Sequence, residues 1–332
     1  MKREDLYFEL PQELIAQESI EPRDHCKLMV LDKRSGKISH ERFFDLANFL
    51  KPGDILVFNN SKVLPARLNG LRGDSKRELL LLRELGKGEW EVMIGGKVLV
   101  GDKIDFGDSL FCEIIERMDS IYKVRFNFHG LNFLKILNQI GMVPTPPYIK
   151  KIVSDPQQYQ TVYAKVLGSA AAPTAGLHFT HDLLNSLKNQ GVEQEFVTLH
   201  VGLGTFQPVK TNIVEEHPIH SEWYSIDEQV FQKLRAAKEQ GRRIVAVGTT
   251  TVRVLESAFL TGKTEDETAL FIYPGFKFQA VDALITNFHT PYSSLLAMVY
   301  SFTDEQKIKK AYQEAIKRKY RFFSFGDAML IM

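Results

Sequence analysis

Cysteine is scarce in this sequence. Of its 332 residues only Cys26 and Cys112 are cysteines, and no CxxC pair occurs. A disulfide scaffold and a thiolate zinc site are therefore excluded, and this scarcity is typical of proteins kept in a reducing cytosol. We expect a cytoplasmic protein.

Long hydrophobic runs are also missing. No stretch approaches the roughly 18 apolar residues that a membrane span needs. The N-terminal segment MKREDLYFELPQEL is charged and lacks the apolar core of a signal peptide. We therefore expect no contact with a membrane.

The sequence has no excess of charge of one sign, because 42 Lys and Arg residues balance 41 Asp and Glu residues. Nucleic-acid-binding proteins are often clearly basic, so any RNA contact would depend on a local basic surface. Two candidates are Lys150 with Lys151 and the segment KIKKAYQEAIKRKYR at 307–321. The simpler interpretation of this segment is a solvated helix face with i,i+4 charge pairs.

Several signatures of catalytic and cofactor sites are absent, namely HExxH, GxSxG, the Walker A loop and GxGxxG. Gly202 and Gly204 form a GxG, but no helix clearly follows them. The segment HPIHSE at 217–222 invites a zinc interpretation, yet Pro218 disfavours the regular helix that would present two histidines on one face. We expect no metal site.

The sequence contains two kinds of hydrophobic pattern, and its length is compatible with two domains. From about residue 63 to residue 128, short apolar runs alternate with glycine and charged turns, which is typical of a small antiparallel β-barrel. Elsewhere strands alternate with helices, which indicates a largely parallel α/β architecture, open or barrel-like. We predict a large α/β domain of residues 1–61 and 151–332, with a β-barrel domain of residues 62–150 inserted into it.

Hydrophobic periodicity predicts the individual elements of the large domain. The predicted strands are 26–32, 53–59, 193–202, 242–248, 269–273 and 281–288. The predicted helices are 43–50, 181–190, 227–240, 252–260, 293–302 and 304–320, with a further helix at 133–141.

In parallel α/β folds the binding crevice lies outside the carboxyl ends of the strands. Three predicted strands lead to His200, to Gly248 and to His289. Three threonines follow Gly248 at 249–251, and a single helix cap needs only one hydroxyl. With the free amides of a helix start they could hold a carboxylate or a phosphate, and the serines at 293–294 leave the same two alternatives.

The stretch GSAAAPTAGLHFTHDLL at 168–184 places small residues beside His178 and His181. It predicts either a tight backbone crossing in the core or a pocket wall that a ligand approaches closely. Histidines near strand ends or flanking loops favour a polar site capable of acid–base chemistry. These histidines are His178, His200, His217, His220 and His289.

The motifs FNNSKVLPARL, YQTVYAKVLGSAAAPTAGLHFT, TLHVGLGTFQPV, HPIHSEWYSI, AVGTTTVRVLES, LITNFHTPYSSLL and YRFFSFGDAMLI together closely resemble the S-adenosylmethionine:tRNA ribosyltransferase-isomerase family of queuosine biosynthesis. The resemblance runs from about Leu10 to the C-terminus and implies a modified α/β barrel-like large domain with a small inserted antiparallel β-barrel. It also implies that the ribosyl part of S-adenosylmethionine is transferred and isomerised onto 7-aminomethyl-7-deazaguanine at the tRNA wobble position. Epoxyqueuosine forms, and adenine and methionine are released.

The resemblance further implies tRNA with a GUN anticodon as the partner and S-adenosylmethionine as a consumed co-substrate, with no cofactor and no metal. We expect a monomer. The candidate catalytic residues are His178, His200, His220 and His289, with acid and base unassigned among them. The candidate substrate-binding residues are Ala175, Gly176, Phe179, Gly202, Gly204, Thr205, Phe206, Glu222, Thr249, Thr250, Thr251, Arg253, Asn287, Ser293 and Ser294.

Two other functions are compatible with the residues alone. One is a metal-dependent hydrolase that uses His178, His217, His220 and Glu222. The other is a non-catalytic RNA-binding module in which the β-barrel contacts the RNA. Release of adenine from S-adenosylmethionine would separate the transferase from both.

Overall fold

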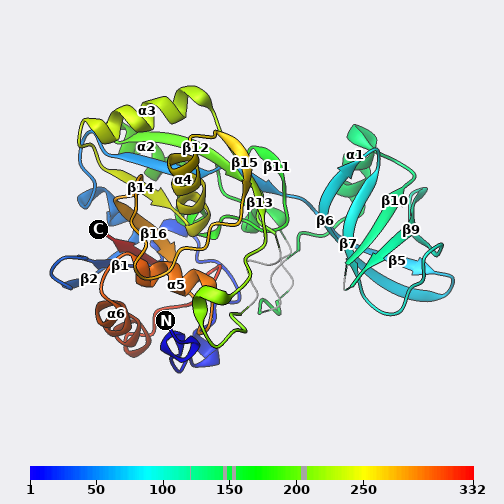
Figure 1. Ribbon diagram of the computed structural model, residues 1–332, viewed down its shortest axis with the longest axis horizontal. Helices are drawn as coiled ribbons and strands as arrows, with labels where there is room; N and C mark the ends of the chain where they lie inside the picture. The colour runs from blue at the N-terminus through cyan, green and yellow to red at the C-terminus, as the bar shows by residue number, and fades with distance from the viewer. Residues whose placement is uncertain (120, 145–147, 152–154, 203–207) are drawn as a thin grey trace.

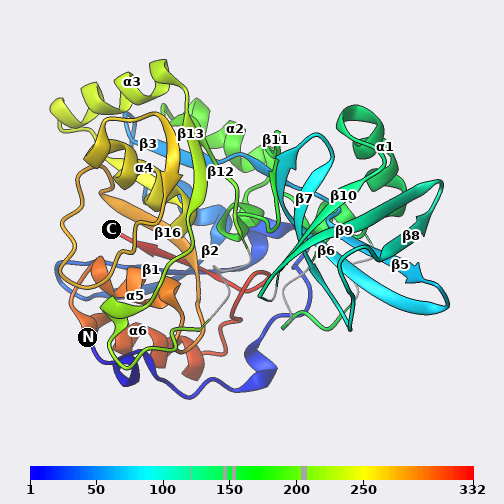
Figure 2. The ribbon, with the colours of Figure 1, turned by 45° about the vertical axis from the view of Figure 1, so that its right-hand side comes forward.

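The computed structural model describes residues 1–332 except residues 120, 145–147, 152–154 and 203–207. The chain forms a large α/β body, which carries both termini, and a separate β-barrel joined to one side of it (Figure 1). Turning the molecule by 45° brings the barrel forward beside the large body (Figure 2). Within the described residues, no helix combines the length and the apolar character needed to cross a membrane.

Nine strands of the described chain form the sheet of the large body. In spatial order they are β15 (Glu265–Thr268), β13 (Glu222–Ile226), β12 (Glu193–Leu199), β3 (Ile55–Asn59), β14 (Ile244–Val247), β16 (Ala283–Asn287), β17 (Ala328–Ile331), β1 (Lys27–Leu31) and β2 (Ile38–Arg42). The run β12-β3-β14-β16 is parallel, and β1 and β17 also pair in parallel, whereas the other pairs are antiparallel.

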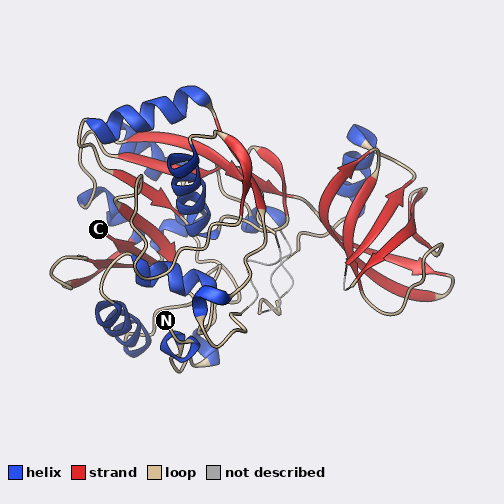
Figure 3. Ribbon diagram, viewed as in Figure 1, coloured by secondary structure: helices blue, strands red, loops and turns tan. Residues whose placement is uncertain are grey.

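Helices cover both faces of this sheet (Figure 3). Their bounds are α2 (His181–Asn189), α3 (Glu228–Glu239), α4 (Thr249–Thr261), α5 (Ser294–Ser301) and α6 (Glu305–Lys317). The 3-10 helices are Arg3–Leu6, Gln12–Leu14, Arg23–His25, Phe43–Asn48, Pro156–Tyr159, Thr174–His178 and Val214–Glu216.

The central strand β3 shows why both faces are buried. Ile55 and Val57 point into a core shared with α3 to α6, while Leu56 and Phe58 point into a core shared with α2. Successive strand residues face opposite sides of the sheet, so the continuous apolar run ILVF contributes buried side chains to both cores. The helices start at side-chain caps where the sequence supplies one, as at Asp227 before α3.

The barrel closes in the order β10-β7-β6-β5-β8-β9 within the described residues, with antiparallel pairs. Its strands are β5 (Arg67–Arg72), β6 (Ser75–Gly86), β7 (Glu89–Ile94), β8 (Lys103–Gly107), β9 (Leu110–Met118) and β10 (Ile121–Phe126), and α1 (Gly130–Ile140) packs against its core. A two-stranded sheet of β4 (Ser61–Val63) and β11 (Val166–Ser169) lies where the chain leaves and re-enters the large body.

The predicted fold class, an α/β body with an inserted antiparallel β-barrel, is confirmed. Three local predictions need correction. The sheet is mixed rather than largely parallel, and residues 43–48 form a 3-10 helix rather than a regular helix. Residues 269–273 form no strand, because the main-chain carbonyls of Thr268 and Leu270 accept hydrogen bonds from the Arg253 guanidinium, and the edge strand β15 ends at Thr268.

Candidate functional site

A cavity of about 280 Å³ lies at the carboxyl ends of β14 and β16, against the first turn of α4. This is the position that the strand-end rule predicts for a ligand site. Among the described residues its lining consists of Tyr148, Ala172, Pro173, Thr174, Ala175, Val201, Pro208, Gly248, Thr249, Thr250, Thr286, Asn287, His289, Thr290, Ser293, Leu295, Phe323 and Ser324.

The first turn of α4 presents amides and one hydroxyl to this cavity. Gly248, with φ of +89°, is the cap residue of α4 and has no side chain to satisfy the helix start. The three predicted threonines therefore lie inside the helix and do not cap it. The Thr251 hydroxyl donates to the Val247 carbonyl at 2.7 Å, and the Thr250 hydroxyl accepts from Asn59 Nδ2 at 3.3 Å.

Thr249 differs from the other two threonines. It is 7% exposed and lines the cavity, and its hydroxyl has no hydrogen-bond partner within the described part of the chain. An uncapped helix start beside such a hydroxyl can bind a carboxylate or a phosphate group through main-chain N–H donors and the helix dipole.

The end of β16, the strand next to β14, supplies Asn287 and His289 to the lining of the same cavity. The His289 imidazole is partly buried, its Nε2 lies 3.0 Å from the Thr286 hydroxyl, and burial lowers the pKa of His289 to about 3. The ring is consequently neutral at pH 7 and can accept a hydrogen bond, and its lowered pKa makes it a weaker base than a free imidazole.

The small-residue stretch forms a pocket wall, whereas the nearest neighbours of Gly176 are side chains, so no tight backbone crossing explains its small size. Residues 172–175 line the cavity, so this part is a pocket wall. Gly176 instead belongs to a close packing contact, because a Cβ atom there would lie 1.9 Å from the Tyr163 hydroxyl oxygen and 2.9 Å from Thr161 Cγ2. Its small size serves the contact with Tyr163.

His178 is 4% exposed and does not line the cavity. Its Nδ1 lies 3.2 Å from Cys26 Sγ, and its Nε2 lies 3.1 Å from Asn287 Nδ2. Burial, with smaller contributions from Arg321 and Arg23, lowers the pKa of His178 to about 3. Asn287, which does line the cavity, connects His178 to it through this contact.

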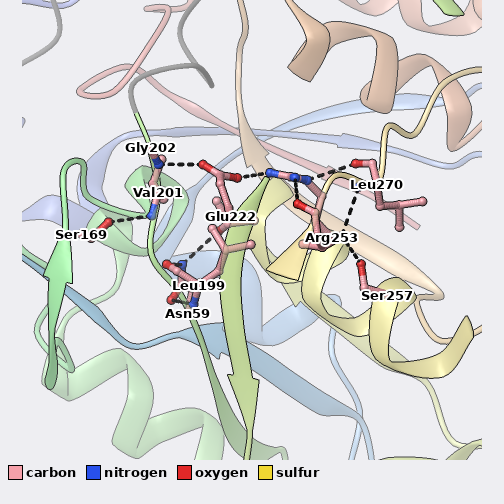
Figure 4. A network of polar contacts seen from close by, with 11 residues as sticks. Asn59, Ser169, Leu199, Val201, Gly202, Glu222, Arg253, Ser257 and Leu270 are labelled. Atoms are coloured by element: carbon pink, nitrogen blue, oxygen red, sulfur yellow. Dashed lines mark hydrogen bonds and ion pairs between the residues drawn. The ribbon is translucent and has the colours of Figure 1, made fainter. Parts of the chain in front are cut away.

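Glu222 and Arg253 form a buried ion pair that joins β13 to α4 (Figure 4). Glu222 Oε1 accepts a hydrogen bond from the Gly202 main-chain N–H at 2.7 Å. Arg253 donates to the carbonyls of Thr268 at 2.8 Å and Leu270 at 3.1 Å. The network ties the segment after β12 to the segment after β15.

The remaining candidates lie in three other surroundings. His200 packs between Gly168 and the Trp223 ring, whose centroid is 5.1 Å away, and burial lowers the pKa of His200. The exposed His220 lines a second pocket of about 30 Å³ together with Ser294. Phe179 is a core residue, with edge-to-face contacts in the apolar cluster under the sheet.

Ser293 lines the cavity, but its hydroxyl is the cap of α5 and accepts from the Leu296 amide at 3.1 Å. Gly204, Thr205 and Phe206 lie outside the described residues.

Two aromatic residues of the wall were not among the predicted site residues. The rings of Tyr148 and Phe323 stack at 3.9 Å between centroids. They come from the proline-rich linker and from the segment after α6, which lie 175 positions apart in sequence and follow no strand. Phe323 lies within the motif YRFFSFGDAMLI of the family resemblance, whereas Tyr148 lies in none of the quoted motifs, so the sequence offered a signal for Phe323 alone.

The metal-dependent alternative requires its candidate ligands to lie close together. Within the described ranges, no group of three His, Cys, Asp or Glu side chains is arranged to hold a metal ion. Glu222 is paired with Arg253, and His217 packs edge-on against Phe271 at 6.3 Å. The hydrolase alternative therefore has no supporting cluster in the described chain.

The fold and the cavity define a protein with a ligand site at the strand ends of an α/β body that carries an inserted β-barrel. Comparison with known proteins gives the family. The family model described as "Queuosine biosynthesis protein" matches residues 3–331. The chain belongs to this family, and it is an enzyme of the transferase class.

The curated relatives match along their whole length. The S-adenosylmethionine:tRNA ribosyltransferase-isomerase of Caldanaerobacter subterraneus subsp. tengcongensis is 50% identical over 343 residues, and that of Carboxydothermus hydrogenoformans is 49% identical over 339 residues, in each case covering 100% of both chains. The crystal structure of the S-adenosylmethionine tRNA ribosyltransferase of Thermotoga maritima is similar with a TM-score of 0.57 and 38% identity, over 99% of this chain and 100% of that one.

Proposed function

We propose that this enzyme transfers and isomerises the ribosyl moiety of S-adenosylmethionine onto 7-aminomethyl-7-deazaguanine at the wobble position of a tRNA with a GUN anticodon. The products are epoxyqueuosine-tRNA, adenine and methionine. Membership of the queuosine biosynthesis family and the names of its curated relatives support the general reaction. S-adenosylmethionine is consumed, and no cofactor or metal is needed.

One observation carries this proposal at the level of the site. The uncapped start of α4, with the Thr249 hydroxyl, lines the same cavity as the neutral His289 imidazole. S-adenosylmethionine requires both features, an anion site for the methionine carboxylate and a base for a proton next to the sulfonium.

Each group of residues that lines the cavity has a role in the proposed reaction. The sulfonium acidifies the C5′ protons of the ribose, and His289 removes one of them as general base. The stacked rings of Tyr148 and Phe323 offer π faces to the sulfonium cation. Adenine leaves as a neutral base after protonation, and methionine leaves as a neutral thioether. His200 and His220 remain candidates for the proton donor.

The tRNA partner is proposed to bind through local basic surface. Lys317, Arg318 and Lys319 are exposed at the end of α6, and Arg318 also donates to Glu314 at 2.5 Å. Lys151 is paired with Glu18, so the charge of this second candidate is partly neutralised. We propose that the enzyme acts as a monomer in the cytoplasm, where its tRNA substrate is found.

The decisive measurement is single-turnover release of adenine from S-adenosylmethionine with tRNA that carries the 7-deazaguanine precursor. Release with this tRNA, and none with the same tRNA carrying guanine, is the expected result. Binding of tRNA without adenine release would support the RNA-binding module instead. Loss of activity on chelation, with stoichiometric zinc in the purified protein, would support the hydrolase.

The carboxylate site is tested separately by Thr249→Val, which removes the hydroxyl and keeps the shape of the side chain. We expect KM for S-adenosylmethionine to rise about tenfold, the usual effect of losing one hydrogen bond to a charged group. Thr251→Val is the matched control, because that hydroxyl faces the Val247 carbonyl and does not line the cavity. Equal effects of the two variants would contradict the assignment.

A further inference from the structure

A chain of hydrogen bonds leads from a buried cysteine to the cavity wall. It runs from Cys26 Sγ to His178 Nδ1 at 3.2 Å, and from His178 Nε2 to Asn287 Nδ2 at 3.1 Å. Asn287 Nδ2 also lies 3.0 Å from the main-chain carbonyl oxygen of Phe323. Of these residues, Asn287 and Phe323 line the cavity, whereas Cys26 and His178 are buried and do not line it.

The Phe323 carbonyl determines which atom donates and which accepts in each of these hydrogen bonds. A carbonyl oxygen only accepts hydrogen bonds, so the amide atom 3.0 Å from it must be the donor nitrogen of Asn287. That nitrogen also donates to His178 Nε2, which must then be the unprotonated ring nitrogen. The ring proton of His178 therefore lies on Nδ1 and is donated to Cys26 Sγ.

The Phe323 carbonyl is itself held in place. Phe323 has φ of +69°, a left-handed conformation that is unfavourable for a residue with a bulky side chain. Its N–H donates to the Phe288 carbonyl at 2.9 Å, and its ring stacks on Tyr148. Unusual backbone conformations of this kind persist where the surrounding structure over-determines them, often next to functional sites.

With this orientation of the Asn287 amide, its side-chain oxygen Oδ1 is not used by Phe323 or His178 and can face the cavity. With Nδ2 occupied by Phe323 and His178, Oδ1 points toward the Thr174 hydroxyl at 3.4 Å, and Thr174 lines the cavity as well. A contact of 3.4 Å is long for a hydroxyl donor. Oδ1 therefore retains acceptor capacity for a ligand.

We propose that His178 and Cys26 are positioning residues that lock Asn287 with Oδ1 facing the cavity, where it accepts a hydrogen bond from the adenosine part of S-adenosylmethionine. The proposal rests on the proposed function for the identity of this ligand. The donor is an N–H of the adenine amino group or an O–H of the ribose. His178 acts through Asn287 and exchanges no proton with the substrate.

The ring proton can be observed directly in the full-length wild-type protein. With ¹⁵N-labelled histidine, NMR reports which imidazole nitrogen carries hydrogen, and the signal that His178→Gln removes is the one to follow. We expect the Nδ1–H tautomer from pH 6 to pH 8, with and without S-adenosylhomocysteine. An Nε2–H tautomer, or an imidazolium in that range, overturns the proposal. This measurement needs no active variant.

Variants separate positioning from acid–base catalysis. His178→Gln retains a carbonyl acceptor for Asn287 Nδ2 but cannot titrate, whereas His178→Ala retains neither property. We expect His178→Ala to raise KM for S-adenosylmethionine about tenfold, the scale of one lost buried hydrogen bond, and His178→Gln to recover most of that loss. Cys26→Ser should likewise perform better than Cys26→Ala.

A kcat at saturation that falls equally in His178→Gln and His178→Ala, with unchanged KM, overturns the proposal, since this pattern would identify His178 as an acid or base. His181→Gln is the matched control, because His181 is exposed at the start of α2. Thermal melts of all variants identify any that have simply lost their fold, and for these the NMR result on the wild-type protein decides.

Ligand analogues identify the donor. Binding of S-adenosylhomocysteine is compared with that of its inosine counterpart, which lacks the amino group, and of its 2′-deoxy and 3′-deoxy counterparts. Wild-type enzyme should discriminate against one of the three about tenfold, and Asn287→Ala should lose that discrimination. Discrimination that survives in Asn287→Ala contradicts the role of Oδ1. Because these are binding titrations, their result stands apart from adenine release, whose failure would count against the proposed function alone.

Discussion

Glu222 and Arg253 form a buried ion pair whose members come from β13 and α4 and are both less than 10% exposed. The sequence predicted both as substrate-binding residues, and the structure places them against each other. Removing one partner leaves the other charge buried without its ion-pair partner, which typically costs about 3–5 kcal/mol. We therefore expect Arg253→Met to lower the unfolding free energy by about this amount in urea titrations.

The exposed pair Lys263–Asp266 provides the control for this prediction. Asp266→Asn should change the unfolding free energy by less than about 1 kcal/mol, because solvent screens surface pairs. Similar losses in the two variants would contradict a structural role for the Glu222–Arg253 pair.

Gly176 gives a second prediction, which concerns packing. A Cβ atom there would overlap with the buried hydroxyl of the partly buried Tyr163, so Gly176→Ala must displace that ring. Overpacking of this kind typically costs about 1–3 kcal/mol. We expect a lower melting temperature in calorimetry. Gly95→Ala is the matched control, since its new Cβ would meet only an ordinary contact, 3.7 Å from the Glu78 carbonyl oxygen.

The end of α6 gives a prediction about tRNA. Replacing Lys317, Arg318 and Lys319 together with alanine should weaken tRNA binding and flatten its salt dependence, because each phosphate contact contributes to the slope against salt concentration. Binding of S-adenosylmethionine should not change. Replacing the scattered exposed lysines Lys37, Lys51 and Lys188 controls for net charge. An unaltered tRNA affinity would return the cluster to the role of a solvated helix face.

The sequence located the site well where local rules apply. Gly248, Thr249, Asn287 and His289 follow buried strands, and the carboxyl ends of parallel strands meet at one edge of a sheet. The strands themselves are recognisable because they are continuously apolar. These features depend on residues within a few positions of one another.

The sequence could not show which side of a wall a residue occupies. His178 and His289 are both histidines beside small or polar residues, yet His289 lines the cavity while His178 lies behind Asn287. Tyr148 and Phe323 meet only after two distant connecting segments pack together. Such contacts are set by tertiary packing, which no local pattern encodes.

The buried histidines predict how stability depends on pH. Burial lowers the pKa of His178 to about 3, whereas the unfolded chain protonates the same ring near pH 6.5. Between these values the unfolded state binds one proton more than the folded state, so stability falls as pH falls below 6.5 and does not change above it. One such group contributes a slope of about 1.4 kcal/mol per pH unit.

Urea titrations at pH 7.5, 6.0 and 5.0 measure this slope in a range where carboxylates contribute little. His289, with its pKa also lowered to about 3, adds in the same direction. His178→Gln should reduce the dependence of the unfolding free energy on pH by about 1.4 kcal/mol per pH unit, the contribution of one proton. The exposed His181→Gln should leave it unchanged, and an equal reduction in both variants would contradict the assignment to burial.

We expect His289 to act as the general base. His289 is the candidate histidine that lines the cavity among the described residues, and its neutral ring can accept the C5′ proton. His289→Gln should retain the fold and the affinity for S-adenosylmethionine, while single-turnover adenine release should fall by about 10²-fold or more, the usual contribution of a positioned proton-transfer group.

Because the pKa of His289 lies near 3, the acid limb of the wild-type rate profile should lie well below pH 6.5. His25→Gln, in an exposed position away from the cavity, should remain within a few-fold of wild type. Adenine release at the wild-type rate from His289→Gln would remove this residue from the mechanism, and His200 would then be tested next by the same measurement.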